Sequence, residues 1–198
     1  MKTLYLERST GECRKGDWVE QLDLEGIERI VVGTGPGSFA GIRSAIAFAQ
    51  GYVIARPSVG LFGLPSPCAI VGTDPKFVGT GPEFCSKGSG IAVVGDARQG
   101  KVWLALFTGG VLQKAVYQVE IAELEAEIKR FQAECEGKIA VISPDHRRIG
   151  DFLREKLGES YLGEALPTAE GLRAYAEAHP EALVTEPLPI YLNPAVRS

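Results

Sequence analysis

The stretch Gly33-Thr34-Gly35-Pro36-Gly37-Ser38-Phe39-Ala40-Gly41-Ile42-Arg43 follows a short apolar run, Ile30-Val31-Val32. An apolar strand, a glycine-rich turn and a long apolar segment together indicate a loop that opens onto the N-terminus of a helix. Three glycines within five residues allow the backbone to adopt positive φ and to approach another surface closely. Ser38 can cap the helix by accepting a hydrogen bond from a free amide of its first turn.

The loop over residues 33–43 has functional interpretations beside a structural one. A helix N-terminus can hold an anion. However, the dinucleotide-binding fingerprint matches only in part, because its sixth position is Ser38 instead of glycine. The P-loop is excluded because Gly41-Ile42-Arg43 has neither the lysine nor the hydroxyl residue of that motif. A ligand site, a partner-binding loop and a tight structural turn all stay open.

A long helix is predicted over residues 39–55, which contain no proline and a single charge, Arg43. One face, expected to cover a sheet, carries Phe39, Ile42, Ile46, Ala49 and Val53. A second stripe of small residues, which would let another helix approach closely, consists of Gly41, Ala45 and Ala49 and extends toward Phe48 and Tyr52. A helix that is apolar all round is buried on more than one side. The second side is therefore expected to contact another part of the same fold or a partner subunit.

The composition is that of a globular protein, with 45% hydrophobic and 23% charged residues among 198. The formal net charge of −4 argues against strong nucleic-acid binding by the whole surface. No apolar run reaches the ~20 residues that span a membrane, and the N-terminal segment lacks a signal-peptide core. The four scattered cysteines form no Cys-x-x-Cys pair, which favours reduced thiols in the cytoplasm and predicts no metal site.

Strands and helices are expected to alternate, which favours an α/β fold with mixed sheets. The predicted strands are residues 3–6, 18–21, 27–32, 59–62, 91–94, 101–107 and 138–142, with a turn at 14–17. Besides 39–55, helices are predicted after Pro65, over 121–135 and 149–157, and after Pro167 with Thr168 as a cap. Residues 72–90 are rich in Gly, Pro, Ser and Thr. They are expected to separate an N-terminal lobe, residues 1–90, from a C-terminal lobe, residues 91–198.

A search for catalytic groups finds no complete set. Glu7 stands at the end of the first strand, where a single carboxylate is a weak signal. Asp96 and Arg98 belong to the short turn of a hairpin, which is predicted from the strands 91–94 and 101–107, and they favour a surface role. Asp145 and His146 are neighbours in a loop, and such neighbours seldom point together. No catalytic residue, cofactor or metal ligand is therefore predicted.

Four motifs occur in one order along the chain: Gly35–Arg43, Asp96–Gly100 followed by Val102-Trp103, Pro167–Leu172, and Pro189–Leu192. Together they resemble the TsaB (YeaZ-like) family, a subunit of the bacterial machinery that makes threonylcarbamoyladenosine in tRNA. The resemblance covers about residues 27–62, 91–107 and 165–194.

The resemblance implies an actin-like fold of two lobes, of the ASKHA class with its ribonuclease H-like motif. It also implies a subunit that has no catalysis of its own, pairs with a related catalytic subunit, TsaD, and supports threonylcarbamoyl transfer to the adenosine beside the anticodon. The matching loop residues are Gly35, Pro36, Gly37, Ser38, Phe39, Gly41 and Arg43. Family partnering uses the first two helices, one of which follows the glycine loop. Partner contacts are therefore expected from Phe39, Gly41, Ile42, Ala45, Phe48, Ala49 and Tyr52.

The chain departs from the family pattern near its start. Leu6–Thr10 stands where family members have Asp-Thr-Ser/Thr, and Gly11–Glu25 is too short for the third strand and long helix that usually precede the loop. A shortened N-terminal lobe is therefore expected. Three functions follow: a noncatalytic partner subunit in tRNA threonylcarbamoylation, a diverged homodimeric scaffold outside tRNA modification, and a small nucleotide- or phosphate-binding protein that uses the 33–43 loop.

Overall fold

The computed structural model describes residues 1–10, 19–73 and 89–192, and the chain divides into two compact units. Unit 1 comprises Met1–Thr73 and Pro167–Tyr191, and unit 2 comprises Asp74–Leu166 and Leu192–Ser198. The sequence pattern predicts a single boundary at residue 90. The two units differ from that division, because the segment Pro167–Tyr191 returns to pack with the N-terminal residues. The predicted turn at 14–17 and most of the predicted linker, residues 74–88, lie outside the described residues.

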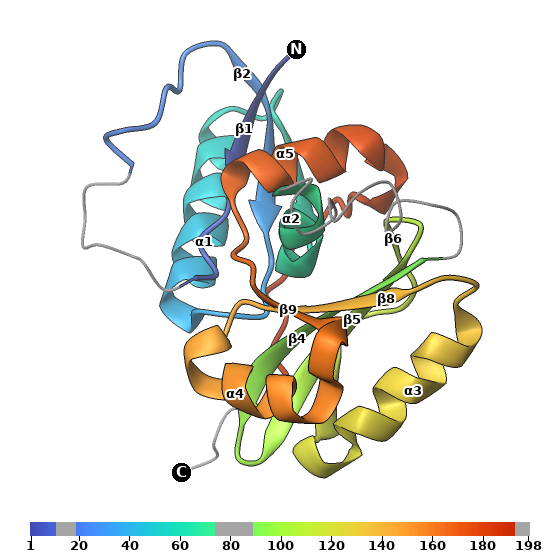
Figure 1. Ribbon diagram of the computed structural model, residues 1–198. Coiled ribbons are helices and arrows are strands. Elements are labelled where there is room, and N and C mark those ends of the chain that lie inside the picture. Colours follow the sequence, from blue (N-terminus) through green and yellow to red (C-terminus); the bar gives the residue numbers. More distant parts are fainter. Residues whose placement is uncertain (11–18, 74–88, 193–198) are drawn as a thin grey trace. The chain divides into compact units, whose positions relative to one another are not determined.

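Unit 1 is built on a parallel sheet with the strand order β1-β2-β3. The strands are β1 (Lys2–Leu6), β2 (Ile27–Gly33) and β3 (Gly60–Leu64). Helix α1 (Phe39–Ala55) connects β2 to β3, as a parallel pair requires. The other helices are α2 (Ser66–Thr73), α5 (Ala169–Ala178) and the short 3₁₀ helix η3 (Pro180–Ala182). In Figure 1, α1 lies on one side of these strands and α2 and α5 lie on the other.

Both faces of the β1-β2-β3 sheet are covered, as in other parallel sheets. Ile30 and Val32 point toward α1 and join its buried side chains in one core cluster. Val31, between them in the strand, points to the opposite face and is also fully buried. On that face α2 and α5 pack so closely that a Cβ at Gly171 would collide with the carbonyl oxygen of Ala69. Only glycine permits this approach of the two helices.

Unit 2 contains a mixed sheet with the order β6-β5-β4-β8-β9, in which β7 also pairs with β5. The strands are β4 (Gly90–Arg98), β5 (Lys101–Thr108), β6 (Val111–Leu112), β7 (Tyr117–Glu120), β8 (Ile139–Ser143) and β9 (Tyr161–Glu164). Strands β4 and β5 form the predicted antiparallel hairpin, whereas β4, β8 and β9 run parallel. The helices are η1 (Ile121–Glu123), α3 (Leu124–Glu134), α4 (His146–Leu157) and η2 (Gly158–Ser160).

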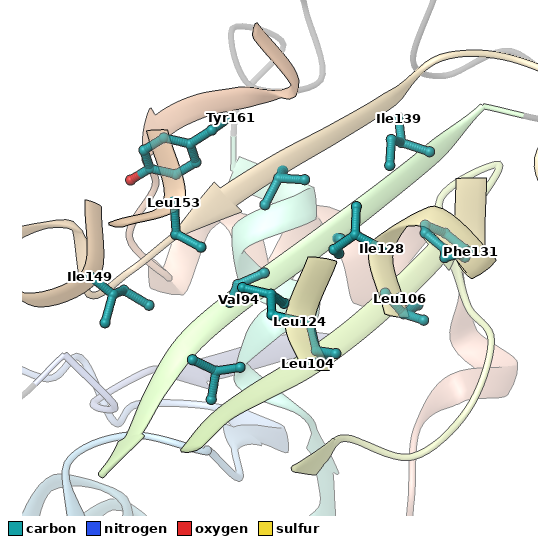
Figure 2. Close-up of a cluster of buried hydrophobic side chains, with 13 residues drawn as sticks. Val94, Leu104, Leu106, Leu124, Ile128, Phe131, Ile139, Ile149, Leu153 and Tyr161 are labelled. Carbon is teal, nitrogen blue, oxygen red and sulfur yellow. The ribbon is translucent and has the colours of Figure 1, made fainter. Parts of the chain in front are cut away.

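The core of unit 2 lies between this sheet and helices α3 and α4, as Figure 2 shows. Helix α3 contributes Leu124, Ile128 and Phe131, whose spacing of four and three residues places them on one side of the helix. Helix α4 contributes Ile149 and Leu153 in the same way. These side chains cover alternating residues of β4 and β5, which point to the same face of the sheet. The apolar side of each helix and the apolar face of the sheet thus form one buried layer.

Most of the predicted strands and helices correspond to described ones. Strands β6, β7 and β9 were not predicted, and α4 begins at His146 instead of residue 149, so His146 lies in the helix and not in a loop. One predicted strand is wrong. Val19, Glu20 and Gln21 form a turn instead of the predicted strand, and Trp18 lies outside the described residues. In the part of the chain that the structure describes, none of the helices combines the length and the apolar character that a membrane span requires.

Candidate functional site

The glycine loop between β2 and α1 adopts the conformation that its glycines allow. Gly35 has φ +91° and Gly37 has φ +154°, and the Gly35–Pro36 peptide bond is cis. A Cβ at Gly37 would collide with the carbonyl oxygen of Ser9, so the loop lies directly against the chain that follows β1. The hydroxyl oxygen of Ser38 accepts a hydrogen bond from Gly41 N at 3.3 Å, which confirms the predicted helix cap.

Backbone amides of this loop are already engaged within unit 1. The donor–acceptor pairs are Thr34 N to Leu64 O (2.8 Å), Gly35 N to Ser66 Oγ (3.0 Å) and Ser38 N to Ser9 O (2.7 Å). A phosphate-binding loop needs such amides to point at its ligand. The hydrogen bonds instead fix the loop to β3, α2 and the end of β1, which supports the structural interpretation.

Glu7 places its carboxyl group beneath the loop. Its Oε1 accepts a hydrogen bond from Ser9 N at 2.8 Å, and its Oε2 lies where a Cβ at position 33 would be, so only Gly33 fits beside it. Burial raises the pKa of Glu7, whereas hydrogen bonds from Ser9 and Ser66 act in the opposite direction. Burial therefore disfavours the charged form of this carboxyl group, which lies against Gly33.

Helix α1 buries the residues from which partner contacts were expected. Five of the seven candidates are buried in unit 1: Gly41, Ile42, Ala45, Ala49 and Tyr52. Four of them belong to the core cluster of unit 1, and Ala45 and Ala49 have no exposed surface. The small-residue stripe therefore contacts the chain's own core, and these five side chains are not available to a partner. Phe48 is half-buried, and Phe39 is exposed.

The exposed face of α1 lies one step around the helix from that stripe. It consists of Phe39, Ala40, Arg43, Ala47, Gln50, Gly51, Ile54 and Ala55. Ile54 is 79% exposed, and a Cβ at Gly51 would meet no neighbour within 4 Å. The sequence interpretation missed most of these positions, because an all-apolar helix gives no polar side from which the outer face could be recognised.

Among the other predicted loop residues, Gly35 and Pro36 are buried, Gly37 and Arg43 are exposed, and Ser38 is half-buried. Arg43 holds its guanidinium carbon 4.9 Å from the ring centroid of Phe39. Tyr191, in the motif near the C-terminus, places its ring beside the same phenylalanine. The sequence interpretation had not connected Tyr191 with this loop, since nothing in their spacing links positions so far apart.

A second group of charged residues lies in unit 2, at the turn between β4 and β5. Asp96 accepts a hydrogen bond from Arg98 N at 2.8 Å, and its carboxylate lies 3.4 Å from the guanidinium of Arg148. Gln99 and Gly100 have φ values of +54° and +76°, as a two-residue hairpin turn requires. The motif Asp96–Gly100 thus forms a hairpin turn whose aspartate joins the turn to α4.

Asp145 and His146 do not form a catalytic pair, since their side chains have different partners. Asp145 Oδ2 accepts a hydrogen bond from Asp96 N at 2.9 Å, whereas His146 Nδ1 lies 2.8 Å from the hydroxyl of Tyr161. Burial raises the pKa of Asp145, whereas the hydrogen bond from Asp96 N and the charge of Arg148 act in the opposite direction. Within residues 1–10, 19–73 and 89–192, no group of three His, Cys, Asp or Glu side chains could hold a metal ion.

Comparison with known proteins finds similar structures, whereas comparison by sequence finds no match. No protein-family model matches the chain, and no curated protein matches it significantly. A crystal structure of an uncharacterised protein from Pseudomonas aeruginosa with similarity to peptidase YeaZ superposes with a TM-score of 0.61 at 19% identity, covering 88% of this chain and 78% of that one. YeaZ from Pseudomonas aeruginosa gives a TM-score of 0.59 at 19% identity, covering 87% and 79%.

These superpositions establish the fold. The chain has the mixed α/β fold of YeaZ, which is actin-like, and this confirms the fold predicted from the sequence. The resemblance in the four sequence motifs and the likeness in structure thus converge on the same YeaZ-like architecture.

Proposed function

We propose that this chain is a noncatalytic, TsaB-like partner subunit that supports threonylcarbamoylation of the tRNA adenosine beside the anticodon. The observation that carries this proposal is the likeness to YeaZ over 87% of the chain. The four motifs support it because they occur in the order of the family that the sequence resembles. The proposal gives the chain a TsaD-like catalytic subunit as its partner and the cytoplasm as its location.

The outer face of α1 supports a function in assembly. Ala40, Ala47 and Gly51 have small side chains or none, so they project little from this face of the helix. Ile54 adds an exposed apolar side chain. Small residues allow the backbone of a second helix to approach closely. The face is therefore suited to a partner helix, and it replaces the buried stripe as the surface that we assign to the TsaD-like subunit.

The two alternatives have less support. A phosphate-binding function is opposed by the hydrogen bonds of the glycine loop, because Thr34 N, Gly35 N and Ser38 N donate within unit 1. A homodimeric scaffold would use the same exposed face of α1, so oligomeric state decides between self-association and a different partner.

Co-purification from the native cell tests the proposal. The tagged chain is expected to recover the cell's TsaD-like subunit, and Ala47→Arg should abolish this recovery because Ala47 is exposed on α1. The matched control is Ala126→Arg, since Ala126 is exposed on α3 in unit 2 and the same change there leaves α1 intact. Ala45 is unsuitable for this experiment because its side chain is fully buried.

The outcomes separate the three functions. Recovery of the TsaD-like subunit by the unmodified chain and by Ala126→Arg, but not by Ala47→Arg, supports the proposal. Recovery of the chain alone, with a dimer in analytical ultracentrifugation, identifies a homodimeric scaffold and contradicts the proposal. Heat of binding from ATP or inorganic phosphate in calorimetry, without TsaD-like protein, favours the phosphate-binding alternative.

A further inference from the structure

Three side chains form an exposed stack where α1 begins. The guanidinium carbon of Arg43 lies 4.9 Å from the ring centroid of Phe39, and the rings of Phe39 and Tyr191 lie 5.6 Å apart at 39°. Phe39 is 58% exposed and Tyr191 is 55% exposed. We propose that this stack is the contact point for a carboxylate-bearing segment of the partner protein. The inference rests on the proposed function and adds the residues and the chemistry of the contact.

Tyr191 is held beside Phe39 by the extended segment that precedes it. Gly63 and Val184 exchange two backbone hydrogen bonds of 2.8 and 3.1 Å, and Ile190 N donates to Thr34 O at 2.8 Å. These bonds fix the segment to β3 and to the glycine loop. Since Tyr191 follows directly after Ile190, its ring is positioned before any partner binds, which lowers the entropy cost of association.

The residue types of the stack are those that interfaces concentrate. Phenylalanine, tyrosine and arginine are enriched at protein interfaces, and tyrosine and arginine are common among the residues that dominate binding. Leu188, on the same extended segment, is also exposed, at 71%. Aromatic rings stacked on an arginine form a broad, rigid surface, whereas a typical solvent-facing surface carries flexible charged side chains.

The charge of the stack specifies the partner's chemistry. Helix α1 has no acidic residue, and among the described residues Arg43 forms no ion pair. A guanidinium that stacks on a ring keeps its N–H edge free, and that edge matches a carboxylate in a bidentate hydrogen-bonding geometry. The partner is therefore expected to present an Asp or Glu to Arg43, with apolar side chains against Phe39 and Tyr191.

A single-stranded nucleic acid could also stack on such rings and place a phosphate at Arg43. The formal net charge of −4 opposes that ligand, because phosphate backbones bind mainly through surplus positive charge. We therefore assign the stack to protein, and tRNA enters the experiment as the competing ligand.

The experiment measures affinity for the TsaD-like subunit of the same organism by biolayer interferometry, with total tRNA of that organism as a second analyte. Phe39→Ala and Arg43→Glu are expected to weaken binding of the TsaD-like subunit by about tenfold or more. Tyr191→Ala should weaken it several-fold, and Tyr191→Phe should restore it, because the ring alone positions Phe39. Rising salt should weaken binding by the unmodified chain more than binding by Arg43→Glu.

The control is Arg154→Glu, because Arg154 also lies over an aromatic ring, that of Tyr161 at 5.9 Å, but in unit 2. Unchanged affinity in this control, with losses in the stack variants and unchanged thermal unfolding, supports the inference. If the unmodified chain binds the TsaD-like subunit and all stack variants bind it equally well, the inference is wrong and the proposed function stands. Absence of binding by the unmodified chain overturns both. Loss of tRNA binding alone in Phe39→Ala overturns the inference in favour of a nucleic-acid surface.

Discussion

Helices α1 and α3 each cover a sheet of their own unit, yet their outer faces have opposite character. The outer face of α3 carries charged residues that pair along the helix, with Lys129 Nζ 2.6 Å from Glu125 and Arg130 beside Glu127. The outer face of α1 carries mainly alanine, glycine, phenylalanine and isoleucine, with Gln50 as a polar side chain and Arg43 as its single charge. Water satisfies the polar surface of α3, whereas the apolar surface of α1 gains free energy only when another molecule covers it.

This contrast indicates which surface is the better candidate for an interface, since the described residues include no recognised set of catalytic groups. Single exposed apolar side chains are ordinary, but a continuous outer face of one helix is not. The buried stripe of α1, with Ala45 and Ala49, stabilises unit 1, and we propose that the exposed positions one step around the helix serve assembly. The predictions below test that division between the two faces and between the two helices.

The largest effect is expected from Ala45→Arg. Ala45 is fully buried between α1 and the sheet, so an arginine there places an unpaired charge and a long side chain in the core. The free energy of unfolding should fall by more than about 4 kcal/mol, enough to abolish folding of unit 1. Circular dichroism during urea titration measures this change.

Ala47→Arg is the matched control on the exposed face of the same helix. Its free energy of unfolding should stay within about 0.5 kcal/mol of that of the unmodified chain. Equal destabilisation by the two substitutions would show that α1 has no free face, and the contrast with α3 would then be wrong.

Much of the fold could be predicted from local sequence signals. The helix over 39–55 was predicted with the bounds that the structure gives, because Ser38 caps its start and no proline interrupts it. Thr168 caps α5 as predicted, through a 3.0 Å hydrogen bond from Gly171 N. The hairpin of β4 and β5 followed from two apolar strands around a short turn. In each case the signal lies within a few residues of the element that it determines.

The candidate site depended on contacts between distant residues, and these had no local signal. The apolar pattern correctly placed Ile42, Ile46 and Ala49 against the sheet. It did not show that Ala45 and Tyr52 face the same core or that Phe39 is exposed, because packing against β2 decides this. The stack of Phe39 and Tyr191 depends on the hydrogen bond between Ile190 and Thr34. The position of Glu7 under Gly33 likewise follows from strand pairing, which the sequence interpretation did not specify.

An intermediate effect is expected from shortening one apolar side chain in each helix. Leu124→Ala in α3 removes a fully buried side chain from the core of unit 2, so the free energy of unfolding should fall by about 2–5 kcal/mol. Ile54→Ala in α1 should change it by less than about 0.5 kcal/mol, because Ile54 is 79% exposed. Denaturant titration of both variants measures the difference. A loss in Ile54→Ala comparable to that in Leu124→Ala would mean that the chain itself covers the outer end of α1.

The smallest effect is expected from Glu7→Gln, and it depends on pH. Because burial raises the pKa of Glu7 above its ordinary value of 4.5, the folded chain holds this proton more tightly than the unfolded chain. The contribution of Glu7 to the free energy of unfolding is therefore fully present below pH 4.5, and it is lost as the pH rises through the pKa of Glu7 in the folded chain. Glutamine cannot ionise, so the variant should lack this loss and should exceed the unmodified chain by about 1–3 kcal/mol at alkaline pH.

Glu125→Gln in α3 is the control for this pH dependence. The hydrogen bond and charge of Lys129 lower the pKa of Glu125, so its contribution has the opposite sign and is lost as pH falls. Glu125 is also exposed to solvent, which makes that contribution small. Urea titrations between about pH 4 and pH 9 give the free energy of unfolding of all three proteins. If the difference between Glu7→Gln and the unmodified chain is the same at every pH, the Glu7 carboxyl is not confined beneath the loop, and the start of α1 is as open to solvent as the surface of α3.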